Sequence, residues 1–176
     1  MKPIVQKNDP VLRALATEVP LADIGSLRVK MVIQDMKEAL AEQADGIAIA
    51  APQIGVSLQI FLVSGTLLKE VDPTYMGPAE DLIFINPVIT KRSRIKHKVE
   101  EGCLSVRWLY GQIKRSDKVS LTAYDHQGQP ITRGASGLLA QIFQHETDHL
   151  NGILFTDEAE EIWEMTEEEI RDLQKR

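Results

Sequence analysis

The chain has 176 residues, of which 43% are hydrophobic and 26% are charged, as expected for one folded domain with a substantial core. Its 20 Lys and Arg residues against 26 Asp and Glu residues give a net charge of −6, which argues against a bulk-basic nucleic-acid-binding protein. The excess lies in residues 157–176, which hold nine acidic and three basic residues, so residues 1–156 are neutral. We therefore expect no sequence-specific binding of nucleic acid.

The cysteine content and the length of the apolar runs indicate the cellular compartment in which the protein is expected. A single cysteine, Cys103, excludes an internal disulfide and indicates a reducing environment. Nothing approaches the roughly 20 apolar residues that a membrane-spanning helix needs, and residues 1–20 resemble neither a signal peptide nor a transit peptide. We expect a cytoplasmic protein with no membrane partner.

An apolar stripe at helical spacing predicts a first helix over residues 27–43. Asp45-Gly46 ends it. The stripe consists of Val29, Val32, Ile33, Met36 and Leu40.

Short apolar or alternating runs predict strands in the middle of the chain, separated by turns rich in glycine and proline. The expected strands are 58–63, 82–89, 93–99 and 119–124, with a loop over 64–81. A second helix is expected over 136–150, ended by Asn151-Gly152, and the tail from Glu158 has a helix-forming composition. This order predicts an α+β fold, with antiparallel strands packed around the second helix and further helices near both ends.

The second helix carries His145-Glu146-Thr147-Asp148-His149. Residues four apart lie about 40° apart around a helix, so both imidazoles can reach one metal ion at about 2.1 Å. Glu146 lies one residue along, where a carboxylate can act as a general base without ligating the metal. The alternative is a surface pair of histidines beside a solvated glutamate, but the apolar flanks of the motif argue against it.

A catalytic metal site needs a third protein ligand, and two regions could supply it. One is Cys103, within Glu101-Gly102-Cys103-Leu104-Ser105, because a thiolate binds Fe²⁺ or Zn²⁺ well and Gly102 permits close approach of the backbone. The alternative for Cys103 is a small core residue. The other region is the acidic run after Glu158, which has the composition of a solvated surface.

A third stretch, residues 46–55, is dominated by small residues and bracketed by glycines. Such a segment admits another chain close to its backbone. Gln53 is a polar side chain in an otherwise apolar run. The simpler interpretation is a tightly packed loop, and the absence of a Gly-Lys-Ser/Thr sequence excludes a phosphate-binding loop.

Together, and in this order, the three stretches resemble the motifs of the peptide deformylase family, whose members remove the formyl group from new N-terminal methionine. The matching segments are 46–53, 101–105 and 145–150, and the resemblance extends over about residues 3–156. It implies a catalytic domain over 1–156 with residues 157–176 as an acidic helical extension of the same domain. It also implies N-formylmethionyl nascent peptides as substrate.

The resemblance implies roles for individual residues. Cys103, His145 and His149 would ligate one divalent metal ion, natively Fe²⁺, which Zn²⁺, Ni²⁺ or Co²⁺ can replace. Glu146 would be the acid/base residue, and the Gln53 amide and the Leu104 N–H would hold the formyl oxygen. The expected substrate-binding residues are Gly46, Ile47, Ala48, Gly102, Leu138 and Ile142.

This chain departs from the family pattern at three positions. Ala48 stands where the family commonly has glycine, and Arg107, followed by Trp108, stands where it often has proline. Arg107 and Trp108 would lie at the rim of the pocket and change its affinity for peptides.

Two other functions stay open at this point. One is a metallopeptidase that uses His145, Glu146 and His149 and has no need of Cys103. The other is a metal-binding homologue that has lost turnover.

Two further expectations concern surfaces. The basic segment 91–98 could make a transient contact with the ribosome, although an exposed hairpin with solvated charges explains it more simply. Removal of residues 158–176 is expected to change solubility or protein contacts more than the catalytic rate.

Overall fold

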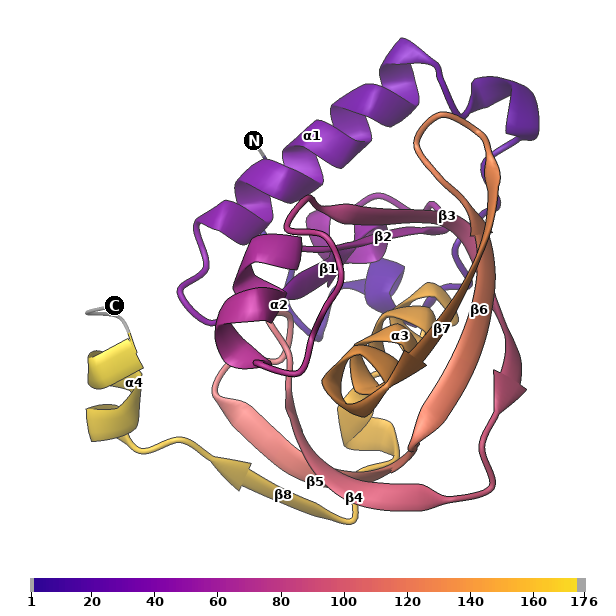
Figure 1. The fold of residues 1–176 in the computed structure, drawn as a ribbon. Coiled ribbons are helices and arrows are strands. Elements are labelled where there is room, and N and C mark those ends of the chain that lie inside the picture. The colour runs from indigo at the N-terminus through magenta and orange to yellow at the C-terminus, as the bar shows by residue number, and fades with distance from the viewer. Residues whose placement is uncertain (1, 174–176) are drawn as a thin grey trace.

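A computed structural model describes residues 2–173, so the last three residues of the acidic tail lie outside the described part. Two antiparallel sheets surround a central helix (Figure 1). The first sheet has the order β1-β2-β3-β6-β7, formed by Ala48–Ala50, Ile60–Val63, Leu82–Arg92, Lys118–Tyr124 and Pro130–Ser136. The second has the order β4-β5-β8, formed by Lys96–Gly102, Leu109–Ser116 and Glu161–Glu164.

The central helix is α3 (Gly137–Leu150), and it lies within the curve of the strands in Figure 1. The other helices are α1 (Leu27–Ala41), α2 (Gly65–Val71) and α4 (Glu167–Leu173). In the described part of the chain, four short 3₁₀ helices complete the fold: η1 (Pro10–Arg13), η2 (Leu21–Asp23), η3 (Ala51–Ile54) and η4 (Phe155–Asp157). None of the helices within residues 2–173 has the length and apolar character needed to cross a membrane.

Aromatic packing fixes the orientation of α3 about its own axis. Phe143 packs against Phe61 of β2 and Phe84 of β3, with ring centroids 5.9 and 4.9 Å away. Such contacts add to the free energy gained by burying the rings. Because Phe143 is held against the first sheet, the side chains of His145 and His149 are directed toward the β4–β5 side of the helix, where they meet residues 101–103.

The α+β architecture expected from the sequence is confirmed, and so is the first helix. Ser26 caps α1 by accepting a hydrogen bond from the Val29 N–H, and the predicted apolar stripe is buried. One expectation is wrong: residues 65–71 form helix α2 rather than part of a loop. Ser64 caps α2 through the Leu67 N–H, and Leu68 is fully buried, so local capping and burial outweigh the flanking glycines and prolines.

The tail also differs from the expected continuous helix. Residues 161–164 form strand β8, which pairs with β5 so that Ile162 lies opposite Gly111 and Trp163 opposite Tyr110. Just before the strand, Glu160 bridges Lys98 and Lys114 with N–O distances of 2.7 and 2.5 Å. Pairing with β5 outweighs the helical preference of the composition, and helix begins only at Glu167.

Candidate metal centre and active site

Two segments distant in the sequence bring a thiol and two imidazoles together. His145 and His149 lie one turn apart on α3, with ring centroids 4.9 Å from each other. Cys103 follows directly after β4, and its Sγ lies 3.2 Å from Nε2 of His149. The potential ligand atoms of the three residues all lie within 4.8 Å of one another. A soft thiolate beside two imidazoles suits Fe²⁺ or Zn²⁺, so this donor set fits the metal that the sequence predicts.

Glu101 fixes the orientation of the His145 ring. Its Oε2 lies 2.9 Å from Nδ1 of His145, which leaves Nε2 as the nitrogen available to a cation. Metal-ligating histidines are commonly held in this way by a carboxylate on the second ring nitrogen. The contact explains the position of Glu101 two residues before Cys103, at the end of β4.

A buried arginine in turn holds Glu101. Arg115 of β5 donates from Nε and Nη2 to the two Glu101 oxygens at 2.8 and 2.9 Å, and from Nη1 to Asp148 at 2.6 Å. Burial disfavours ionisation of Glu101, but the hydrogen bonds from Arg115 and His145 hold its pKa at about 2. Asp148, the fourth residue of the helical motif, therefore holds the same guanidinium from the helix.

The same contacts favour a thiolate at Cys103. Burial alone would raise the pKa of the thiol, but the imidazoles of His149 and His145 lower it to about 5. Burial also works against protonation of His145, yet Cys103 and Glu101 raise the pKa of its imidazole well above the usual value. The cluster therefore has the charge balance of a thiolate beside a cationic His145 imidazole, and a divalent cation can take the place of the proton.

Glu146 is buried, with 4% of its surface exposed, and its Oε2 has no hydrogen-bond partner among the described residues. Burial is the main reason that its pKa rises to about 7, although both imidazoles oppose the shift. A buried carboxylate oxygen without a partner has an unsatisfied capacity to accept a hydrogen bond. Because Glu146 lines the same pocket as Cys103 and His145, this oxygen is available to a water molecule or a substrate there.

Gln53 places an amide N–H₂ in the same pocket, next to Cys103. Its Oε1 accepts from the Ala50 N–H at 2.8 Å, which directs Nε2 toward Ser105 Oγ at 3.3 Å and Cys103 Sγ at 3.6 Å. The side chain is only 2% exposed and is carried on η3. Its donor is therefore fixed in position before any ligand arrives.

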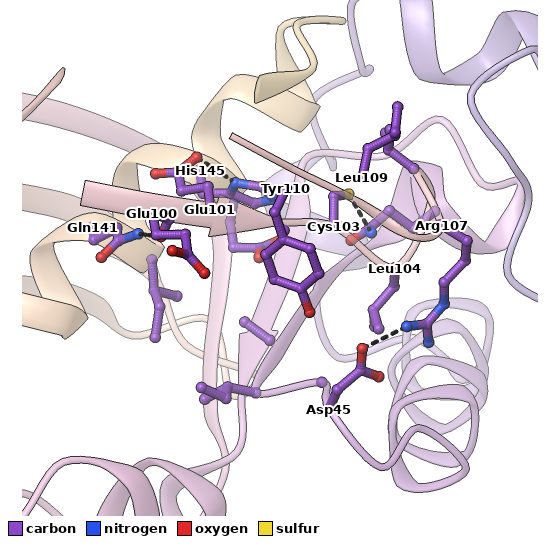
Figure 2. Close-up of a pocket in the computed structure, with 18 of the residues that line it drawn as sticks. Asp45, Glu100, Glu101, Cys103, Leu104, Arg107, Leu109, Tyr110, Gln141 and His145 are labelled. Atoms are coloured by element: carbon purple, nitrogen blue, oxygen red, sulfur yellow. Dashed lines mark hydrogen bonds and ion pairs between the residues drawn. The ribbon is translucent and has the colours of Figure 1, made fainter. Parts of the chain in front are cut away.

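One pocket collects nearly all of the residues predicted for the site (Figure 2). Gln53, Cys103, Leu104, His145 and Glu146 line it, and the buried His149 contacts Cys103. All six residues expected to bind substrate also line it: Gly46, Ile47, Ala48, Gly102, Leu138 and Ile142. Figure 2 shows the loop that carries Cys103 and Leu104 between Tyr110 and Arg107.

Two members of the site, Arg115 and Ser105, have roles that are not predicted from the sequence. Arg115 lies on β5, a strand that the sequence did not predict, and nothing local to it indicates a partner 33 residues further on. Ser105 belongs to a recognised motif, but its bond to Gln53 depends on the fold. An arginine within an otherwise half-buried strand was the one available signal for Arg115.

The fold and this cluster define an α+β protein in which, within the described residues, two histidines of an H-E-x-x-H helix and a cysteine from a neighbouring strand end form one group of potential metal ligands. Comparison with known families agrees, because the family description of polypeptide deformylase matches residues 1–164. The chain belongs to the polypeptide deformylase family.

Individual relatives support the assignment. Peptide deformylase 1A, chloroplastic/mitochondrial, of Arabidopsis thaliana is 40% identical over 165 residues, which are 88% of this chain and 60% of the relative. Peptide deformylase 2 of Clostridium acetobutylicum is 35% identical over 158 residues, which are 89% of this chain and 94% of the relative. The chain thus spans about 60% of the length of the plant relatives and most of the bacterial one.

Solved structures agree with the sequence comparison. The actinonin-bound class I type b peptide deformylase of Acinetobacter baumannii has a TM-score of 0.78 at 29% identity, covering 90% of this chain and 97% of the other. A peptide deformylase of Synechococcus elongatus in complex with actinonin has a TM-score of 0.75 at 30% identity and covers 99% of this chain and 84% of the other.

Proposed function

We propose that the chain is a metal-dependent hydrolase that removes the formyl group from N-formylmethionyl nascent peptides and releases formate. The observation that carries this proposal is the convergence in one pocket of the Cys103–His145–His149 cluster, the unpartnered Glu146 carboxylate and the Gln53 amide. Membership of the polypeptide deformylase family supports the choice of reaction.

Cys103, His145 and His149 would hold the metal, which we propose is Fe²⁺ natively, with Zn²⁺, Ni²⁺ or Co²⁺ able to replace it. A cation bound there would supply a Lewis acid that polarises the formyl carbonyl and makes a water molecule more acidic. The thiolate favours a soft, oxidisable ion such as Fe²⁺.

The protein groups carry the proton transfers. Glu146 would take a proton from the attacking water with its free Oε2 and return it to the methionine nitrogen as the formyl C–N bond breaks. The Gln53 amide and the Leu104 N–H would donate to the formyl oxygen as it gains negative charge. The products are formate and a free α-amine.

The residues that line the pocket suit a substrate that begins with methionine. Ile47, Leu138 and Ile142 are apolar and would receive the methionine side chain, while the backbone at Gly46, Ala48 and Gly102 would hold the peptide. Ala48 lies in β1 and lines the same pocket. A relative from Acinetobacter baumannii, 30% identical, was solved with Met-Ala-Ser bound, which supports a peptide with methionine first.

We propose a cytoplasmic location, as for an enzyme that acts on nascent chains, and take residues 157–176 as an extension of the 1–156 catalytic domain. Any contact with the ribosome through the basic segment 91–98 would be transient. That segment spans the end of β3 and the start of β4, and most of its charges are exposed. Glu160 pairs with Lys98, which weakens its attraction for RNA.

The test measures formate release from an N-formylmethionyl tripeptide by Fe²⁺-loaded, anaerobically handled protein. We expect steady release of one formate per free amine formed. Protein that retains Fe²⁺ and releases no formate would contradict the proposal and favour a homologue without turnover.

Replacement of Cys103 distinguishes this reaction from internal peptide-bond cleavage. We expect Cys103→Ala to lower metal content and formate release together, because the cluster loses its thiolate. Ser105→Ala leaves all three proposed ligands in place and serves as the metal-content control. A Cys103→Ala protein with full metal occupancy and full activity would instead indicate a metallopeptidase-like site with another third ligand.

The tail provides a further prediction. Trp108 and Gln112, at either end of the β8 pairing, bond the tail through Met165 N–H at 2.8 Å and Glu160 N–H at 2.7 Å. Ending the chain at Asp157 removes this support from Leu109 and Tyr110, which line the pocket, so we expect KM to rise about tenfold. This differs from the small effect on rate expected from the sequence.

A shorter truncation provides the control. Ending the chain at Thr166 removes α4 but keeps β8, and we expect near-normal kinetics. If both truncations leave kcat and KM unchanged, the tail acts on solubility alone.

A further inference from the structure

Arg107 joins the two walls of the pocket. We call residues 43–48 the first wall and residues 103–108 the second wall. From the second wall, Arg107 donates Nη1 to Asp45 Oδ2 in the first at 2.5 Å (Figure 2). Its Nη2 donates to Gln43 Oε1, also at 2.5 Å. The side chains of Arg107 and Asp45 are only 21% and 15% exposed, so water screens this pair less than a surface ion pair.

The walls also meet through packing beside this ion pair. A Cβ atom added at Gly46 would lie 2.9 Å from Cδ1 of Leu104 and 2.8 Å from Cδ1 of Leu40. The approach is therefore as close as a glycine allows. Leu104 is the residue whose N–H we propose as an oxyanion donor, so the contact couples that donor to the first wall.

The second wall contains a residue in an unfavourable backbone conformation. Trp108 adopts φ of +60°, a left-handed conformation that is unfavourable for a bulky side chain. Within the wall, the Arg107 guanidinium lies 5.0 Å from the Trp108 ring centroid. From outside it, Gln6 accepts from the Arg107 N–H and donates to the Leu104 carbonyl. Residues in sparsely populated conformations persist only where their surroundings fix them in this way.

The geometry points to Arg107 as a positioning residue that holds the second wall against the first, so that Leu104 N–H and β1 face the same peptide. This inference rests on the proposed function for its kinetic consequence. The planar fork of arginine satisfies Asp45 and Gln43 at once, which a lysine ammonium cannot do with the same geometry. Arg107 itself need not touch the reacting atoms.

The experiment compares Arg107→Ala, Arg107→Lys and Asp45→Asn, all metal-loaded, with the unchanged chain. We expect Arg107→Ala to raise KM for an N-formylmethionyl tripeptide about tenfold, with a smaller fall in kcat and unchanged metal content. Arg107→Lys should raise KM less than Arg107→Ala does. The double variant Arg107→Ala/Asp45→Asn should be no worse than Arg107→Ala alone, because both substitutions break one interaction.

Hydrogen–deuterium exchange gives a readout that does not depend on turnover. Arg107→Ala should increase deuterium uptake in peptides that cover 43–48 and 103–108, and leave uptake in α3 unchanged. Lys37→Ala is the matched control, because it breaks the 2.9 Å ion pair of α1 with Asp81, outside the pocket, and should change neither measurement.

The outcomes separate this inference from the proposed function. If the unchanged chain releases formate but Arg107→Ala has normal KM and normal uptake, the inference is overturned and the function stands. If the unchanged chain releases no formate, the function fails, and uptake in the two walls still decides whether Arg107 holds them together. Additive losses in the double variant would also contradict the inference.

Discussion

Replacement of Glu146 by glutamine is expected to lower kcat for formate release by at least about a hundredfold while the metal stays bound. The amide keeps the size of the side chain but cannot take a proton from water. Because Glu146 is not one of the three clustered ligand residues, its loss leaves the Cys103–His145–His149 set intact. Formate assays and metal analysis on the same preparation measure both effects.

The control for this change is Glu70→Gln, an identical substitution on the exposed face of α2, which should keep normal kcat. Two outcomes would contradict the assignment. Substantial activity in Glu146→Gln would place the general base elsewhere, and loss of metal together with activity would make Glu146 part of the metal site.

Replacement of Arg115 by alanine is expected to have the largest effect on stability. Arg115 and Glu101 are 6% and 3% exposed, and removal of Arg115 would leave the Glu101 carboxylate buried with only the His145 imidazole as partner. Breaking such a pair typically costs about 3–5 kcal/mol, a large part of the total stability of a domain. Urea unfolding, compared with the unchanged chain at the same metal loading, measures the change.

The matched control is Arg13→Ala. Arg13 pairs with Asp157, but both side chains are more than one third exposed, so we expect less than about 1 kcal/mol. We also expect Arg115→Ala to weaken metal binding about 10- to 100-fold, because Glu101 would no longer be fixed beside His145. Equal destabilisation by the two arginine variants would mean that the Arg115 pair contributes nothing beyond a surface contact.

The sequence predicts the site better than the sheets around it. The two histidines share one face because of helix geometry, and the residues around Cys103 are contiguous in the sequence. Both motifs can therefore be identified without knowing which distant segments they contact. Strand β5 was not predicted because its sequence does not alternate: Arg115 and Ser116 are both buried, and Gly111 is close-packed against β8. Strand β7 contains a proline and a glycine, which are tolerated because it lies at the edge of the sheet.

The remaining errors also arise from contacts between distant segments. Residues 161–164 would suit a helix by composition, yet they gain backbone bonds only by pairing with β5. Arg115 acquires its role from Glu101 and Asp148, 14 and 33 residues away. Local sequence patterns do not indicate which distant segments pair with one another. Strand β8 and the contacts of Arg115 could therefore not be predicted from the sequence.

Strand β8 has one more consequence, for association between copies of the protein. Without it, the β5 edge of the second sheet would present unpaired backbone groups, which can recruit a strand from another molecule. β8 occupies that edge and is itself only four residues long, with all four residues exposed, and it begins and ends in glutamate. A second copy approaching this short edge would meet like charge, so the acidic tail protects the molecule against edge-to-edge aggregation.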